Sequence, residues 1–252
     1  MTNPPKLFVS ACLEAIPCRY DGEALEPFWS KKFHDLFEVI ALCPEQEAGM
    51  TTPRPEMTFI QKSDRVELAV DESNRDLSCQ LFSTALRIML DLTGLDGAIV
   101  KSKSPSCAVD DCKVFTDKNR HNQIGLTEGI FTGVLKKKFP HLPIIDEQEL
   151  VNPQKRISFF IQVIQTSQVN QIVTWEQAQD FHLKQKYFLD LFKRENLKGL
   201  EQAFALRDLK IYQAGFKKLI WNFKVRQGDL NLKAFSEKLK GLIALEQVFA
   251  KK

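Results

Sequence analysis

Short apolar segments that end at turn residues most constrain what this chain can fold into. Residues 7–11 read LFVSA, residues 36–42 read LFEVIAL and residues 97–101 read GAIVK. Apolar runs of this length are typical of buried strands. A similar run, LPII, stands at residues 142–145. We therefore predict buried strands at these places.

Helical patterns separate these strands. The residues between the second and third strands predict a helix with Ser73 as its N-cap and Gly94 as its stop. The apolar positions at helical spacing in this segment are Leu77, Leu81, Ala85, Ile88 and Leu92. Residues 126–138 predict another helix. Strands that alternate with helices predict an α/β domain with an open, largely parallel, Rossmann-like sheet.

The pattern changes after Pro153, where every segment is amphipathic at helical spacing. Thr174, followed by Gln177, is expected to cap one of these helices. We therefore expect two domains, an α/β domain over residues 1–152 and an all-helical domain over residues 153–252.

Charge divides the chain at the same place. Residues 1–152 carry 17 Lys and Arg against 23 Asp and Glu, whereas residues 153–252 carry 18 against 9. The second half is therefore strongly basic. A solvated helix surface would explain this balance, and so would an anionic partner such as nucleic acid.

The cellular setting follows from what the sequence lacks. It has no run of about 18 apolar residues that would cross a membrane, and its first residues, MTNPPKLFVSACLEAIP, lack the layout of a signal peptide. We expect a cytoplasmic protein without a membrane partner. The six cysteines should then be mostly reduced.

Three cysteines lie where predicted strands run into loops. Cys12 and Cys43 each follow a strand directly, and Cys107 follows the third strand after SKSPS. Ligands of open parallel sheets collect outside the carboxyl ends of the strands, so the three thiols are expected near one site. Soft thiolates suit zinc or an iron–sulfur cluster. Buried unpaired cysteines are also common in cores, and spacing alone leaves both interpretations open.

The segments around these cysteines carry a family resemblance. VSACLEAIPCRYDG (9–22), CPEQEAGMTTPRP (43–55) and KSKSPSCAVDD (101–111) together resemble the thiouracil desulfidase family, over roughly residues 6–150. The resemblance implies non-redox removal of sulfur from thiolated pyrimidine bases. It also implies a [4Fe-4S] cluster with one iron free of protein ligands, held by Cys12, Cys43 and Cys107.

The resemblance sorts the other cysteines and exposes one departure. Cys18, Cys79 and Cys112 are interpreted as bystanders. Ala108 stands where the family usually has glycine after SPSC. If that position requires a positive φ, alanine would strain the loop.

Residue chemistry and the resemblance give further site candidates. Water that attacks the ring carbon needs a general base, and a carboxylate beside the cluster, Glu45, suits this role. Ser104 is expected to donate to the base or relay a proton, with Ser106 as the alternative hydroxyl. Candidates to bind substrate are Arg19, Tyr20, Arg54 and Ser106.

The basic half resembles a second known module. FHLKQKYFLDLF (181–192) is similar to the start of a helical domain often fused behind the desulfidase domain, although Gln185 stands where that pattern has histidine. Proteins with both parts resemble tRNA 4-thiouridine desulfidases, which would make tRNA a partner. Expected RNA contacts are Lys184, Lys186, Lys193, Arg194, Lys217, Lys218, Lys224 and Arg226.

Two other functions remain possible from the sequence. The substrate of such an enzyme would be a free thiouracil-type base if the basic half binds no RNA. Alternatively, the protein would carry a cluster and bind RNA without catalysis.

Overall fold

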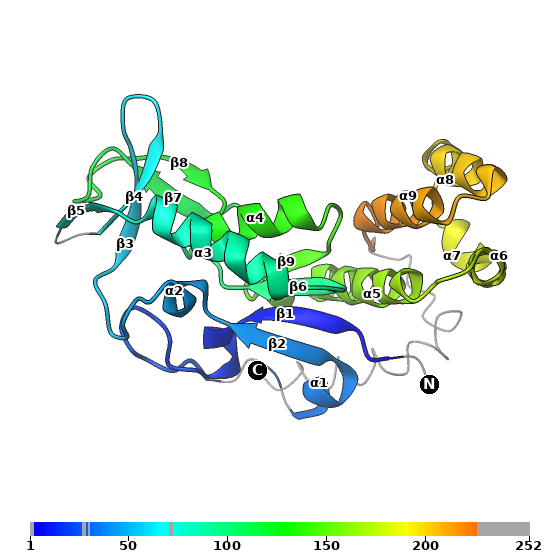
Figure 1. Ribbon diagram of the computed structural model, residues 1–252, viewed down its shortest axis with the longest axis horizontal. Coiled ribbons are helices and arrows are strands. Elements are labelled where there is room, and N and C mark those ends of the chain that lie inside the picture. The colour runs from blue at the N-terminus through cyan, green and yellow to red at the C-terminus, as the bar shows by residue number, and fades with distance from the viewer. Residues whose placement is uncertain (1–2, 27–28, 30, 71–72, 226–252) are drawn as a thin grey trace.

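Four parallel strands form sheet A at the centre of the molecule (Figure 1). The structure is a computed structural model that describes residues 3–26, 29, 31–70 and 73–225. The strand order is β2-β1-β6-β9, so the first strand of the chain lies inside the sheet. The prediction of an α/β fold with a parallel sheet is confirmed by these strands, β1 (Lys6–Ser10), β2 (Glu38–Leu42), β6 (Gly97–Val100) and β9 (Ile144–Asp146).

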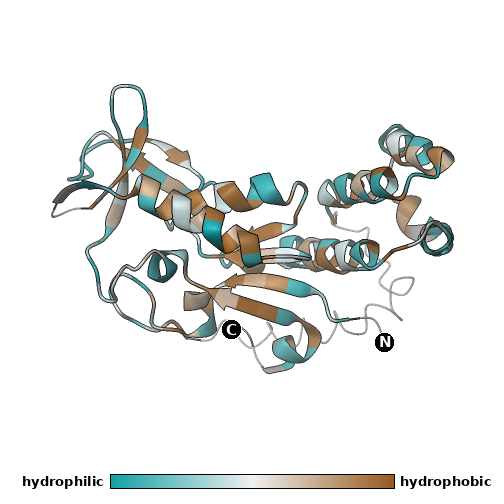
Figure 2. Ribbon diagram, in the orientation of Figure 1, coloured by the Kyte–Doolittle hydropathy of each residue, from teal (hydrophilic) through white to brown (hydrophobic). Residues whose placement is uncertain are grey.

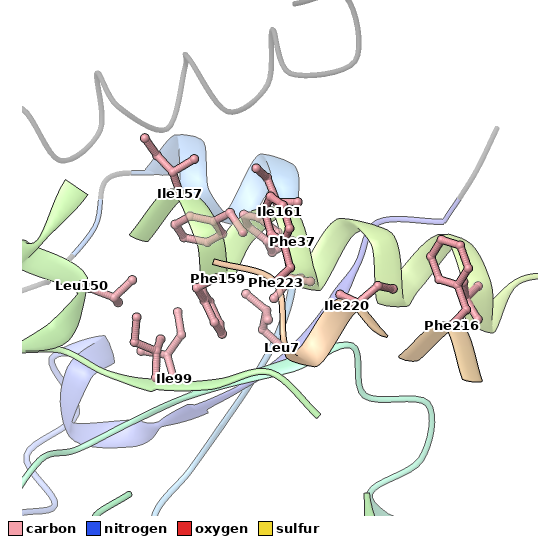
Figure 3. Close-up of a cluster of buried hydrophobic side chains, with 14 of the residues drawn as sticks. Leu7, Phe37, Ile99, Leu150, Ile157, Phe159, Ile161, Phe216, Ile220 and Phe223 are labelled. Carbon is pink, nitrogen blue, oxygen red and sulfur yellow. The ribbon is translucent and has the colours of Figure 1, made fainter. Parts of the chain in front are cut away.

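Helices cover both faces of sheet A. Successive side chains of each strand point to opposite faces and so join different clusters. Leu7, Val9 and Ile99 join one apolar cluster with α5 (Pro153–Asn170) and α1 (Lys31–Leu36), part of which Figure 3 shows. Phe8 and Val100 join the cluster on the other face, beneath α3 (Ser78–Asp91) and α4 (Ile130–Lys138). Figure 2 shows the resulting concentration of apolar residues in β1 and β2.

A second, mixed sheet was not predicted. Sheet B has the order β5-β4-β3-β7-β8 and is inserted between the strands of sheet A. Its strands are short, and the exposed residues of β4, β7 and β8 interrupt any apolar run. The strands are β3 (Met57–Gln61), β4 (Val66–Val70), β5 (Ser73–Asp76), β7 (Cys112–Phe115) and β8 (Gln123–Thr127).

Sheet B corrects two predicted helix boundaries. Ser73 is not an N-cap, because it begins β5, and α3 begins only at Ser78. The backbone N–H of Ser78 donates to Oδ1 of Asp76 at 2.9 Å, so Asp76 satisfies a donor at the start of this helix. Residues 126 and 127 belong to β8, and the following helix, α4, begins at Ile130.

The helices of the basic half lie beyond the end of sheet A where β1 begins (Figure 1). The side-chain amide of Gln171, just after α5, donates to the carbonyl of Asn3 at 3.2 Å. The predicted capping box of Thr174 and Gln177 is confirmed at the start of α6. These helices are α6 (Trp175–Lys184), α7 (Lys186–Leu189), α8 (Arg194–Leu206) and α9 (Leu209–Trp221).

Helix α9 packs back along α5. The side-chain amide of Gln162 donates to the carbonyls of Ile220, Trp221 and Phe223 at 3.0 to 3.2 Å. Helix α5 thus covers the sheet on one side and carries α9 on the other. The amphipathic pattern that predicts helices after Pro153 extends over residues 232–252, which lie outside the described residues. None of the helices in the described part has the length and apolar character needed to cross a membrane.

Substituting Gly97 tests the contact between sheet A and α5. A Cβ at Gly97 would lie 2.6 Å from Cγ2 of Val163 and 3.0 Å from Cδ2 of Leu7. Overpacking of this kind costs about 1–3 kcal/mol, so G97A should lower the free energy of unfolding by that amount in urea denaturation. The control is G199A in α8, where a Cβ meets nothing within 4 Å. It should raise stability by about 0.5–1 kcal/mol, and equal destabilisation in both variants would contradict this packing.

Candidate active site

A pocket opens at the carboxyl ends of the strands of sheet A. Strand β1 has β2 on one side and β6 on the other, so the strand order reverses direction at β1. Open α/β sheets bind ligands at such a point. The pocket has a volume of about 330 Å³. It brings together every candidate from the first half of the chain, namely Cys12, Arg19, Tyr20, Cys43, Glu45, Arg54, Ser104, Ser106 and Cys107.

The three thiols come from the three predicted loops. Cys12 lies in the short helix η1 (Ala11–Glu14) after β1, and Cys43 directly precedes α2 (Pro44–Glu47) after β2. Cys107 lies in the loop between β6 and β7. Cys12 and Cys107 are buried, whereas Cys43 is partly exposed. The expectation that the loops after β1, β2 and β6 meet at one site agrees with this geometry.

A fourth thiol, Cys18, lines the same pocket. Its carbonyl accepts from the Cys43 thiol at 3.8 Å, and interaction with the Cys12 thiol raises the pKa of Cys18. Cys18, interpreted from the sequence as a bystander, thus lines the pocket, and its place between Cys12 and the RYDG segment was a signal of this. Cys79 is exposed on α3. Cys112 is buried outside the pocket and donates to the carbonyl of Lys103 at 3.7 Å.

The donor set fits an iron–sulfur cluster. Among the described residues, no three His, Cys, Asp or Glu side chains are placed to bind a single metal ion. A cluster differs in its demand, because its thiolates bind separate irons and need not converge on one atom. Burial raises the pKa of the Cys107 thiol to about 12. A bound metal supplies the positive charge that holds such a buried thiol as thiolate.

Glu45 is held inside the pocket by two partners. Pro44 stands at the first position of α2, where its fixed φ favours helix, and the next residue, Glu45, is only 7% exposed. Arg54 donates from Nε to Oε2 of Glu45 at 2.9 Å and also forms a short contact through its terminal nitrogen. Ser106 Oγ donates to the other oxygen, Oε1, at 2.6 Å. Both carboxylate oxygens are therefore engaged.

The two serines of the SPSC segment have different environments. Ser104 Oγ accepts from the backbone N–H groups of Ser106 and Cys107 at 3.3 and 3.2 Å, which is a turn-stabilising arrangement. It also lies 3.0 Å from Ser106 Oγ. Ser106 is thus the hydroxyl that contacts Glu45, and Ser104 reaches it only through Ser106.

Glu147, just after β9, anchors the loop that begins at Lys101. It accepts from Lys101 Nζ at 2.6 Å and from the backbone N–H and hydroxyl of Ser102 at 2.8 and 2.6 Å. Burial alone would raise the pKa of Glu147, but these hydrogen bonds outweigh burial and lower it. Glu147 could not be found from the sequence, because no local pattern shows that it binds a loop 45 residues earlier.

The same loop rests on the start of α4. Gly129 donates its N–H to the carbonyl of Ala108 at 2.9 Å, and Thr132 Oγ1 donates to the carbonyl of Cys107 at 2.7 Å. A Cβ at Gly129 would lie 2.4 Å from the backbone of Ser106, so only glycine allows this approach. Ala108 does not have a positive φ. Alanine therefore does not strain the loop at this position.

Arg19 and Tyr20 lie at the mouth of the pocket. Arg19 pairs with Asp21 at 2.7 Å, and Tyr20 is 40% exposed. The carbonyl of Tyr20 accepts from the backbone N–H of Arg54 at 2.8 Å. Both side chains are therefore placed where a ligand entering the pocket would meet them.

Most expected RNA contacts are exposed, at the other end of sheet A. Lys217 differs, because it is half-buried near Asp96, and burial lowers its pKa. Arg226 lies outside the described residues. The exposed candidates are Lys184, Lys186, Lys193, Arg194, Lys218 and Lys224.

Comparison with known proteins identifies the family. A profile described as 2-thiouracil desulfurase matches residues 7–147. The chain belongs to this family of enzymes that remove sulfur from thiouracil. Among solved structures, the chain is similar to one described as the [4Fe-4S]-dependent thiouracil desulfidase TudS, with a TM-score of 0.46 and 23% sequence identity, over 62% of this chain and 99% of that one. A comparison with curated proteins found no match.

Removing Arg54 should expose the cost of burying Glu45. The side chains of Arg54 and Glu45 are only 7% and 9% exposed. Because R54M leaves a buried carboxylate without its cation, it should lower the free energy of unfolding by about 3–5 kcal/mol. The control is R87M, which breaks a pair with Glu47 whose side chains are 58% and 42% exposed. That variant should change stability by less than about 0.5–1 kcal/mol in the same urea titration. Equal losses would mean that Arg54 does not compensate a buried charge.

Proposed function

We propose that this protein is an iron–sulfur-cluster-dependent, non-redox desulfidase that replaces the sulfur of a thiolated uracil with oxygen. One observation carries the proposal. The pocket that contains the thiols of Cys12, Cys43 and Cys107 also contains a buried carboxylate, Glu45. Membership of the 2-thiouracil desulfurase family supports the removal of sulfur from a pyrimidine.

The three cysteines would hold a [4Fe-4S] cluster, as the family resemblance implies. Such a cluster would supply a soft, Lewis-acidic iron with an open position, suited to polarise the carbon–sulfur bond of a thiocarbonyl group. In the overall reaction water adds to the ring carbon, the carbon–sulfur bond breaks, and the products are uracil and hydrogen sulfide. No net oxidation takes place.

The protein's own residues supply proton transfer. Glu45 takes a proton from the attacking water, and the same group later returns it to the departing sulfur or to the base. Arg54 fixes the orientation of the carboxylate through Nε, while Ser106 contacts its other oxygen at 2.6 Å. Ser104 follows Ser106 at 3.0 Å and extends this chain of hydroxyls.

The substitution E45Q tests the role of the carboxylate. Glutamine preserves the size of the side chain but removes the base, so sulfide release from 4-thiouracil should fall by about 10²–10⁴-fold. Iron and sulfide content after anaerobic reconstitution should stay at the level of the unsubstituted protein. The control is E47Q on the same short helix, since Glu47 is exposed and should leave the rate unchanged. Full activity in E45Q would overturn this assignment. A cluster without sulfide release in the unsubstituted protein would favour a non-catalytic cluster carrier.

We further propose that the substrate is 4-thiouridine in tRNA, which the enzyme returns to uridine. The exposed lysines and arginines of α6–α9 support this choice, because phosphate contacts dominate the affinity for nucleic acids. These residues lie beyond the opposite end of sheet A from the pocket (Figure 1). A ligand that contacts both regions must be large, as a folded RNA is and a free base is not.

Charge reversal separates tRNA from a free base. The double variant K193E/R194E at the start of α8 should weaken binding of thiolated tRNA and reduce its salt dependence. Its activity on free 4-thiouracil should not change, because the pocket is untouched. The control is K62E/K118E, which reverses two exposed lysines near sheet B. Unchanged tRNA affinity in K193E/R194E would argue against docking on α8 and favour the free-base alternative.

A further inference from the structure

The fourth thiol of the pocket, Cys18, is placed like a ligand. Cys18 is only 1% exposed, and it lines the pocket together with Cys12, Cys43 and Cys107. Cys18 and Cys12 lie close in sequence after β1, and the Cys43 thiol donates to the backbone carbonyl of Cys18. Cys18 therefore lies beside the cysteines that the proposed cluster requires.

The local backbone explains how the chain returns Cys18 to Cys12. After η1, Ala15 adopts a left-handed conformation with φ of 58°, which turns the chain back. The N–H of Ile16 donates to the carbonyl of Ala11 at 3.3 Å, and the N–H of Cys18 donates to the carbonyl of Ile16 at 2.8 Å. These two bonds close the loop that carries both cysteines.

Contacts from the other loops then fix Cys18 in place. Its carbonyl accepts from a terminal nitrogen of Arg54 at 3.0 Å and from the thiol of Cys43 at 3.8 Å. Arg54 is the same residue that binds Glu45. Cys18 is thus tied to the loop after β2 and to the proposed general base, as a ligand of the same centre would need to be.

We propose that Cys18 is a fourth cluster ligand, which binds the remaining iron while no substrate is present. The inference rests on the proposed function, since it requires a cluster on Cys12, Cys43 and Cys107. Four irons and four thiols then match in number. Binding of Cys18 to iron releases its proton to solvent, and dissociation takes one back, so no oxidant or reductant is needed. The ligand would protect the iron that substrate must reach.

An ordinary core role is the competing explanation. Cys18 belongs to the same apolar cluster as Leu13 and Trp29. If Cys18 only filled space, its replacement by alanine would lower the stability of the fold. It would not change how the cluster responds to oxidation.

Oxidation of the reconstituted protein distinguishes the two. A [4Fe-4S] cluster with one iron free of thiolate readily loses that iron when oxidised, and the product, a [3Fe-4S] cluster, has its own electron paramagnetic resonance signal. We expect the unsubstituted protein, treated with ferricyanide without substrate, to give a weak signal of this kind. C18A should give a signal several-fold larger at equal initial iron content. The matched control is C112S, another buried cysteine that does not line the pocket and whose thiol donates to the carbonyl of Lys103.

Each result decides between the possibilities. Equal signals in the unsubstituted protein and C18A would overturn the inference, as would a folded C18A that takes up no iron, because an exchangeable ligand is not required for assembly. Circular dichroism and urea denaturation establish whether C18A is folded. If C18A is unfolded, C18S replaces it in the same comparison. If no form of the protein binds iron and sulfide, the proposed function itself fails, and this outcome is separate from the failure of Cys18.

Discussion

One buried carboxylate joins the three loops of the pocket. Glu45 follows β2, its partner Arg54 also binds the carbonyl of Cys18 in the loop after β1, and its partner Ser106 lies in the loop after β6. Burying the charges of Glu45 and Arg54 costs several kcal/mol for each ion, which only close pairing and hydrogen bonding offset. The loops must therefore hold their positions together, because moving any one of them would leave a charge or a donor without its partner.

This coupling gives the proposed chemistry its geometry. Arg54 binds both Glu45 and the carbonyl of Cys18, and Ser106, which also binds Glu45, directly precedes Cys107. The same contacts therefore position the proposed base and these thiols. A general base must lie within hydrogen-bonding reach of the proton that it removes. A rigid connection between base and cluster ligands satisfies that condition more reliably than two independent loops would.

The sequence predicted the part of the fold that has strong periodicity. Buried runs such as LFVSA and the helical spacing around Leu81 are local signals, and both were confirmed as β1 and α3. The sequence did not predict sheet B, because exposed residues within β4, β7 and β8 interrupt the apolar pattern. It also missed Glu147, since contacts between distant segments leave no local pattern. In the pocket, the motif cysteines and Glu45 could be named from the sequence. That Ser106, and not Ser104, binds Glu45 depends on the shape of the loop, which the sequence does not show.

The two halves of the chain are joined more closely than a division by charge implied. Helix α5, which follows the proposed boundary at residue 152, supplies Ile157, Phe159 and Ile161 to the core against sheet A (Figure 3). Helix α5 carries only two basic residues, Lys155 and Arg156, and the other lysines and arginines of this half follow it in the chain. The part of the chain available for an independent partner is therefore the region after α5, while α5 itself completes the α/β layer.

The anchor at Glu147 sets an order of events during synthesis. The loop that carries Ser104, Ser106 and Cys107 precedes it in the chain, but three of its hydrogen bonds end on the Glu147 carboxylate after β9, the last strand of sheet A. Until β9 has emerged from the ribosome and paired with β6, this loop lacks its anchor. If the protein carries the proposed cluster, the cluster is assembled in a finished cavity, after the α/β half has folded.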